Sequence, residues 1–276
     1  MVCRVEKPHT WLGVAASFLI CASAAAQEQV SPQQRFQVAT LSRAASELSS
    51  DCSVKKAYGP RAPLYSVRRA LREQRPVKVL AIGSSSTVGV GASSPAAAYP
   101  ARLEVTLEGF LPGVDIRMMN RGVSGETGRG AVERLKLEVA ETMPDLVVWQ
   151  VGTNDALARI DEDDFAETLR EAIDWLEANR IDIVLIDPQY VERLAGDGYY
   201  TRIVKTIAEV AGKERVLLVN RFEAMADLAK RKGNSAFLAQ DRFHLNDVGY
   251  RCMAEYAARA IAAGILQAEA EAARQN

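Results

Sequence analysis

The sequence predicts an α/β fold in which a five-stranded parallel sheet is covered by helices on both faces. Short apolar runs rich in Val, Ile and Leu recur along the chain after residue 76. Longer segments with apolar residues at helical spacing lie between these runs. Strands that alternate with helices form right-handed crossovers, which place the strands in one parallel sheet between two helical layers. We therefore expect a three-layer α/β/α sandwich.

The expected strands are apolar nearly throughout, as strands buried on both faces are. They cover residues 77–82, 114–120, 145–151, 181–187 and 215–220. The expected helices between them cover residues 96–110, 130–143, 163–180 and 199–212. Asn246 or Asp247, both good N-cap residues, begins a last helix that runs through Ile261.

The first 26 residues have the pattern of a targeting segment. Arg4 and Lys7 precede the apolar run "WLGVAASFLICASAAA", which ends in an A-x-A cleavage pattern. A membrane anchor is the alternative, but the run is short for a bilayer span and is diluted by Ala and Ser. We expect a signal peptide cleaved near Ala26, a periplasmic or secreted mature protein, and no stable membrane insertion. The expected organisation beyond it is an arm (27–76), a catalytic domain (77–266) and a helical tail (267–276).

Composition excludes several classes of protein. The 276 residues are 48% hydrophobic and 25% charged, as in an ordinary globular domain. The formal net charge is −1, so no basic field indicates a nucleic-acid partner. Loss of the signal peptide removes one of the two histidines, which leaves His244. Since metal sites gather several ligating side chains, we expect neither a metal nor another cofactor.

Four cysteines are present, and Cys3 and Cys21 leave with the signal peptide. The remaining pair is Cys52 and Cys252. In an oxidising compartment such a pair is expected to form a disulfide that ties the arm to the last helix. Two buried thiols are the alternative.

The residues capable of chemistry follow the ends of the predicted strands. "GSSSTVG" follows the first strand, "NRGVSGETG" the second and "GTND" the third, while "DRFHLND" precedes the last helix. In a parallel sheet all of them project from one edge, where open α/β sheets bind ligands. The first loop has neither the dinucleotide fingerprint nor the Lys-Ser/Thr ending of a P-loop, and G-x-S-x-G is absent from the chain.

These four blocks, in this order from Val77 to Ile261, resemble the SGNH hydrolases, also called the GDSL esterase/lipase family. The resemblance implies a flavodoxin-like SGNH hydrolase fold and ester hydrolysis without a cofactor. It implies that Ser85 is the nucleophile and that Asp241 and His244 complete a catalytic triad. The oxyanion donors that it implies are the N–H groups of Ser85 and Gly122 and the side-chain amide of Asn154.

One position departs from the family pattern, because Ser84 stands where the family usually has Asp. This departure leaves Ser84 and Ser86 open as alternative nucleophiles. The chemistry itself needs a base near the serine, since a hydroxyl is a weak nucleophile until its proton is taken. His244 is the imidazole left for that role in the mature chain, and Asp241 is near enough in sequence to orient its ring.

The sequence thus predicts an exported serine esterase acting on carboxylic esters, O-acetyl esters among them, in a small molecule or a glycan. Two alternatives stay open. An O-acyltransferase acting on polysaccharide would use the same residues, with a sugar hydroxyl in place of water. A non-catalytic glycan-binding module would keep the fold alone.

Overall fold

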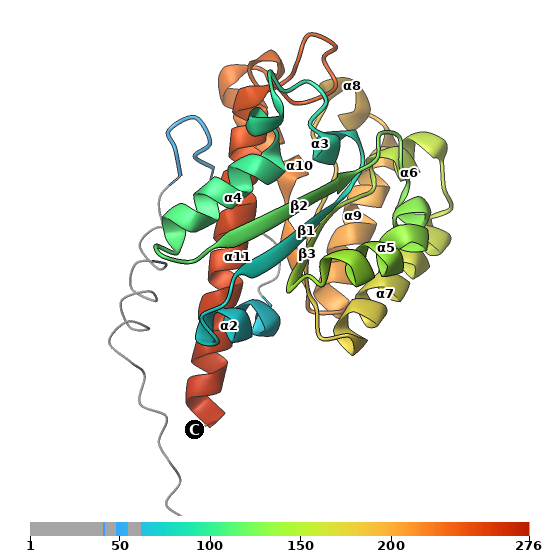
Figure 1. Cartoon of the computed structure of the whole chain (residues 1–276). Helices are drawn as coiled ribbons and strands as arrows, with labels where there is room; N and C mark the ends of the chain where they lie inside the picture. The colour runs from blue at the N-terminus through green and yellow to red at the C-terminus, as the bar shows by residue number, and fades with distance from the viewer. Residues whose placement is uncertain (1–40, 42–47, 55–61, 276) are drawn as a thin grey trace, which may run out of the picture.

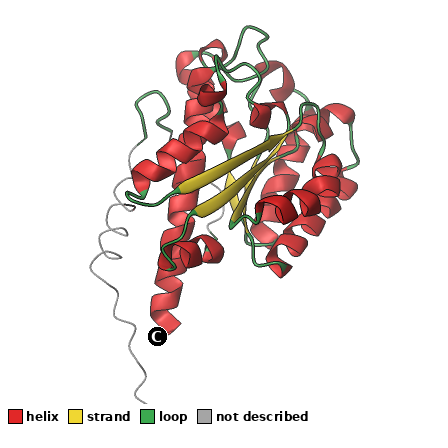
Figure 2. Cartoon of the chain, viewed as in Figure 1, coloured by secondary structure: helices red, strands yellow, loops and turns green. Residues whose placement is uncertain are grey.

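The computed structural model of the chain describes residue 41, residues 48–54 and residues 62–275. The expected signal peptide and most of the expected arm lie outside these residues. Within them, five parallel strands form one sheet in the order β2-β1-β3-β4-β5. Their bounds are Val77–Gly83 (β1), Ile116–Gly122 (β2), Leu146–Gln150 (β3), Asp182–Ile186 (β4) and Leu217–Val219 (β5). The predicted α/β fold with a five-stranded parallel sheet is confirmed (Figures 1 and 2).

Helices cover both faces of the sheet, as expected of strands that are apolar on both sides. One layer contains α2 (Tyr65–Arg72), α4 (Tyr99–Phe110), α10 (Arg221–Lys232) and α11 (Asp247–Gln275). The other contains α5 (Gly128–Thr142), α7 (Glu162–Ala178) and α9 (Gly198–Lys213). Figure 1 shows α4 and α11 on one side of the sheet and α5 and α7 on the other. Side chains alternate along β1 between the two cores, since Val79 and Ala81 face the first and Leu80 and Ile82 the second.

The register brings the carboxyl ends of three adjacent strands, β2, β1 and β3, level. Gly83 of β1 pairs with Gly122 of β2 on one side and with Gln150 of β3 on the other. The loops that follow these strands therefore leave the sheet at the same height. Two short helices stand on these loops, α3 (Ser85–Val88) after β1 and α6 (Thr153–Ala158) after β3, and a third, α8 (Glu192–Ala195), follows β4.

Several elements differ from expectation. Strand β2 begins and ends two residues later than predicted. Helix α10 was not expected, because its sequence "RFEAMADLAKRK" is largely charged; it nevertheless buries Ala224, Met225 and Leu228 along one side. Helix α11 continues unbroken to Gln275, so the expected tail from residue 267 is its last part.

The chain before the sheet packs against the last helix. A disulfide joins Cys52 to Cys252, which is 200 residues further along the chain, with the two Cα atoms 5.0 Å apart. The hydroxyl of Tyr256 donates to the carbonyl of Cys52 at 2.7 Å, and the N–H of Ser49 donates to the carboxylate of Glu255. Residues 48–54 are thereby fixed to α11. Among the described helices, none combines the length and the apolar character that a bilayer span requires.

Candidate active site

The first polar loop turns sharply out of the sheet at Gly83. Its φ of +145° lies in a region that residues with a side chain rarely adopt. A Cβ atom here would lie 2.4 Å from the carbonyl oxygen of Gln150 and 2.7 Å from Oγ1 of Thr87. Glycine therefore lets β1 end against β3 and lets α3 begin at once. The turn presents Ser85 as the first residue of α3, at the carboxyl edge of the sheet.

Ser85, His244 and Asp241 form a continuous chain of polar contacts. Oγ of Ser85 lies 3.0 Å from Nε2 of His244, across 159 residues of sequence. Nδ1 of the same ring lies 2.5 Å from Oδ2 of Asp241. The other carboxylate oxygen, Oδ1, accepts the backbone N–H groups of Phe243 and His244, each at 2.9 Å. The Asp241 carboxylate thus holds both the ring and the turn that carries the ring.

These contacts also set the charge of Asp241. Its partial burial opposes ionisation, but hydrogen bonds from the His244 ring and from two backbone N–H groups outweigh that effect and lower the pKa of the carboxyl. The side chain of Asp241 is 46% exposed and that of His244 is 18% exposed. An ionised carboxylate on Nδ1 leaves Nε2 as the nitrogen that can take a proton from Ser85.

The loop that carries Asp241 and His244 is held on both sides. Leu238 and Leu245 pair as an isolated antiparallel bridge, and the N–H of Ala239 donates to the carbonyl of His244 at 2.8 Å. The Asn246 amide donates to the carbonyls of Ala236 and Leu238. His244 is therefore held between the Leu238–Leu245 bridge and the start of α11.

The two neighbouring serines are engaged elsewhere. Ser84 donates from both its N–H and its Oγ to Oε1 of Gln150, at 3.2 and 3.0 Å. Oγ of Ser86 accepts a hydrogen bond from Nη1 of the fully buried Arg221 at 3.2 Å. Of the three serines, Ser85 is the one whose hydroxyl contacts the His244 ring.

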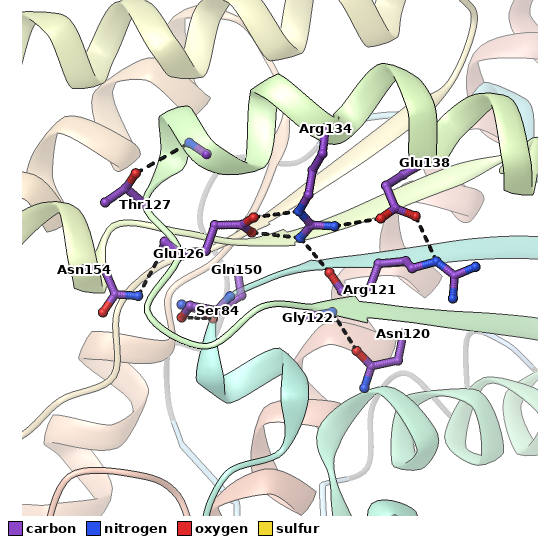
Figure 3. A network of polar contacts seen from close by, with 11 residues as sticks. Ser84, Asn120, Arg121, Gly122, Glu126, Thr127, Arg134, Glu138, Gln150 and Asn154 are labelled. Carbon is purple, nitrogen blue, oxygen red and sulfur yellow. Dashed lines mark hydrogen bonds and ion pairs between the residues drawn. The ribbon is translucent and has the colours of Figure 1, made fainter.

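The three expected oxyanion donors are placed differently. The N–H of Ser85 lies at the first position of α3, where helical N–H groups have no partner within the helix. Asn154, in the first turn of α6, donates from Nδ2 to the carbonyl of Glu126 at 2.8 Å. The N–H of Gly122 donates to Oδ1 of Asn120 at 3.0 Å, so it would have to exchange this partner to bind an oxyanion. Figure 3 shows these contacts together with the Ser84–Gln150 pair.

Gly122 is required at its position for a packing reason. A Cβ atom there would lie 2.4 Å from the backbone nitrogen of Val88 and 2.8 Å from the carbonyl carbon of Thr87. The amide of Asn120 donates to the carbonyl of Thr87 at 2.8 Å. The end of β2 and helix α3 thus lie backbone against backbone.

Asp155, next to Asn154, has a structural role. Its Oδ1 accepts the N–H of Gly128 at 2.8 Å, which anchors the start of α5. Burial raises the pKa of this carboxyl, although backbone hydrogen bonds partly oppose the shift. Among the described residues, no group of three or more His, Cys, Asp or Glu side chains could hold a metal ion.

Several residues around the site were not singled out from the sequence. They are Gln150, which accepts from Ser84, Arg221, which donates to Ser86, and Arg134, which contacts the loop after β2. Gln150 ends an otherwise apolar strand and Arg221 comes two residues after the end of one, which are the signals that could have identified them. Arg134 lies in an ordinary charged helix and carries no such signal.

An open depression of about 700 Å³ borders the triad on the Asp241 side. Its lining includes the polar residues Ser93, Gln240, Asn246 and Asp247. A separate cavity of about 550 Å³ lies at the opposite, amino-terminal edge of the sheet, between Tyr65 and Arg215. Of these two cavities, the first is the one that Asp241 lines.

The relatives found by comparison with known proteins are esterases. An acetylxylan esterase from Geobacillus stearothermophilus is 30% identical over 190 residues, which cover 62% of this chain and 81% of that protein. Esterase TesA from Pseudomonas aeruginosa is 29% identical over 110 residues, covering 40% of this chain and 54% of TesA. A solved structure of a variant of an acetyl xylan esterase from Geobacillus stearothermophilus is 26% identical, with a TM-score of 0.59, and covers 68% of this chain and 96% of that one.

Solved structures from the acetylxylan esterase also include two catalytic mutants, in which a serine or a histidine is replaced by alanine. The predicted resemblance to the SGNH hydrolases is confirmed by these relatives. A model of one family matches residues 51–267. The chain belongs to the non-GDSL lipase-like family.

Proposed function

We propose that the protein is a serine esterase that hydrolyses carboxylic esters, with O-acetyl groups on polysaccharide as its substrate class. The observation that carries this proposal is the contact chain from Ser85 through His244 to Asp241, with its distances of 3.0 and 2.5 Å. The acetylxylan esterase relative supports the acetyl group and the glycan.

In the first half of the reaction, Oγ of Ser85 attacks the acyl carbonyl while Nε2 of His244 takes the hydroxyl proton. The Asp241 carboxylate stabilises the imidazolium that forms. The tetrahedral oxyanion receives hydrogen bonds from the N–H of Ser85 and the second N–H of the Asn154 amide, with Gly122 as the third donor once it leaves Asn120. The imidazolium then protonates the departing sugar alkoxide, which leaves an acyl-serine.

In the second half, His244 takes a proton from water, and the resulting hydroxide attacks the acyl-serine. Collapse of the second tetrahedral intermediate returns the proton to Oγ of Ser85 and releases the acid. Each half-reaction uses the same oxyanion donors. No step needs a cofactor.

Substitution of the nucleophile and the base tests this proposal. We expect Ser85→Ala and His244→Ala to remove nearly all release of acetate from acetylated xylan and of p-nitrophenol from its acetate ester. A serine-directed fluorophosphonate should label the wild-type protein and fail to label Ser85→Ala. Ser66→Ala is the control, since it removes another serine hydroxyl, which is buried at the opposite, amino-terminal edge of the sheet, away from Ser85. Full turnover by Ser85→Ala would exclude the assignment, and transfer of acetyl to an added sugar instead of water would make the protein an acyltransferase.

We also propose that the protein is exported and that its first 26 residues are removed. The bond between Cys52 and Cys252 supports this, because disulfides persist in oxidising compartments. The intact mass of the protein recovered from its native compartment tests the cleavage. A mass that includes residues 1–26 would contradict it.

A further inference from the structure

The loop after β2 is clamped from the side by one arginine of α5. We use the name oxyanion loop for residues 121–127, which are the last two residues of β2 and the loop that follows them. Arg134 donates from Nε to Oε1 of Glu126 at 2.6 Å and from Nη2 to Oε2 at 2.8 Å. Nη2 also donates to the carbonyl of Arg121 at 2.6 Å. Figure 3 shows that the guanidinium reaches both ends of the loop, since Arg121 begins it and Glu126 lies next to its end.

This clamp is largely withdrawn from water. The side chain of Glu126 is 7% exposed and that of Arg134 is 20% exposed. Nη1 of Arg134 is used as well, since it donates to Glu138 on the same helix at 3.0 Å. A two-pronged contact of this kind fixes direction as well as distance, because both N–H groups of the fork must face both carboxylate oxygens. Loss of one partner from such a pair leaves the other buried without its counter-charge.

The clamped loop in turn holds the side chain of Asn154. The carbonyl of Glu126 accepts Nδ2 of Asn154 at 2.8 Å. One of the two amide protons is therefore directed at the loop, which fixes the direction of the other. The N–H of Gly128 donates to Asp155, so the segment next to the loop is tied a second time to α6. Any shift of Glu126 is thus transmitted to Asn154.

We propose that Arg134 is a positioning residue for the oxyanion hole: it holds the Glu126 carbonyl in place, and that carbonyl aims the Asn154 amide at the reacting oxygen. Arg134 acts through Asn154 and does not touch the substrate. This inference rests on the proposed function, because it needs Asn154 to be an oxyanion donor.

The variants Arg134→Met and Arg134→Lys test the clamp. A misplaced donor weakens binding of the transition state without weakening binding of the substrate, so kcat and kcat/KM should fall together. For Arg134→Met we expect kcat to fall about ten- to a hundredfold and KM to change less than about twofold. Arg134→Lys keeps the charge but not the fork, so it should lie between Arg134→Met and wild type.

Arg129→Met is the matched control. Arg129 lies on the same helix and also forms an ion pair, but its partners are Glu171 and Thr168 on α7. Its loss should change the melting temperature without changing kcat. If Arg129→Met and Arg134→Met lower kcat equally at matched temperature below both melting transitions, the proposed role of Arg134 is wrong.

A double-substitution cycle separates an effect of Arg134 through Asn154 from a general disturbance of the structure. Arg134→Met should lower kcat in the wild-type background but change it less than about twofold in the Asn154→Ala background, since the group it positions is then absent. An equal fall in both backgrounds would overturn the inference while leaving the esterase assignment intact. If Asn154→Ala itself leaves kcat unchanged, the oxyanion part of the proposed function fails instead. Arg134→Lys provides the same cycle should the methionine variant not fold.

Discussion

Asp241 and His244 are joined twice within one turn, through the ring and through the backbone. Oδ2 of Asp241 lies 2.5 Å from Nδ1 of the ring, and Oδ1 accepts the N–H of His244 at 2.9 Å. The carboxylate is therefore both the partner of the imidazole and the reason why the turn has its shape. These two roles depend on different oxygen atoms, so substitution can separate them.

The variant Asp241→Asn keeps an oxygen for the backbone N–H groups but loses the charge that stabilises the imidazolium. We expect the melting temperature to change little and kcat to fall about 10³- to 10⁴-fold. Steady-state hydrolysis of p-nitrophenyl acetate measures the fall. A loss smaller than tenfold would show that another group supports His244.

Substitution of Gly122 should disturb the nucleophile through packing. In Gly122→Ala the new methyl group meets the backbone of Thr87 and Val88, so α3 must move away from β2. We expect a loss of about 1–3 kcal/mol in the free energy of unfolding. The accompanying displacement of Ser85 should lower kcat about ten- to a hundredfold.

Gly113→Ala is the control for this prediction. Gly113 has a φ of +84°, and a Cβ atom there meets nothing within 4 Å. Its substitution strains the backbone between α4 and β2, which costs about 1–2 kcal/mol, but it moves no part of the site. Comparable stability loss with unchanged kcat is expected. Equal loss of kcat in both variants would mean that stability alone governs activity.

The disulfide should contribute to stability and not to turnover. It closes a loop of 200 residues, for which the chain-entropy model gives about 5 kcal/mol as an upper value. The double variant Cys52→Ala/Cys252→Ala should therefore unfold at a lower guanidinium concentration while kcat changes less than about twofold. Reductant should shift the wild-type transition in the same direction and leave that of the variant where it is. A wild-type transition insensitive to reductant would contradict this.

Asp187 should make stability depend on pH. It is fully buried after β4, its Oδ1 accepts the N–H of Phe222 at 2.9 Å, and burial raises the pKa of its carboxyl to about 7. In the unfolded chain an Asp carboxyl has a pKa of about 3.9. At a pH between these two pKa values, the folded state therefore holds a proton that the unfolded state has lost. The stability that this provides is complete below pH about 4 and is lost as the pH rises through about 7.

The variant Asp187→Asn removes this dependence, since an amide stays neutral and keeps an oxygen for Phe222. Urea unfolding at pH 5 and at pH 8 measures the effect. The free energy of unfolding of Asp187→Asn minus that of wild type should be larger at pH 8 than at pH 5, because only the wild type loses stability as the pH rises. An unchanged difference would mean that Asp187 is already ionised at pH 5 in the folded protein.

The sequence predicts the fold and the approach of Ser85 to His244, because both depend on local pattern and on topology. Apolar runs separated by amphipathic segments predict the parallel sheet, and parallel strands bring polar residues at their ends to one edge. That edge is where Ser85, Asn154 and His244 lie. The Asn120 side chain also followed a readable rule, since Asn commonly bonds the backbone two residues ahead.

What could not be read from the sequence is which charged side chains turn inward. Arg134 and Arg129 lie five residues apart on one helix, yet Arg134 contacts the oxyanion loop and Arg129 contacts α7. That choice depends on the distance between α5 and the end of β2, which pattern does not give. The fully buried guanidinium of Arg221 likewise depends on oxygens supplied by Asp187, Gln189 and Ser86 from separate elements.

The separation of 159 residues between Ser85 and His244 has a consequence for how the protein is made. A ribosome synthesises Ser85 and most of the sheet long before it reaches His244. Until the final helix has emerged and closed against the sheet, the growing polypeptide has a hydroxyl with no group to take its proton. Under the proposed mechanism, a product that terminates before residue 244 lacks the base and should be inert.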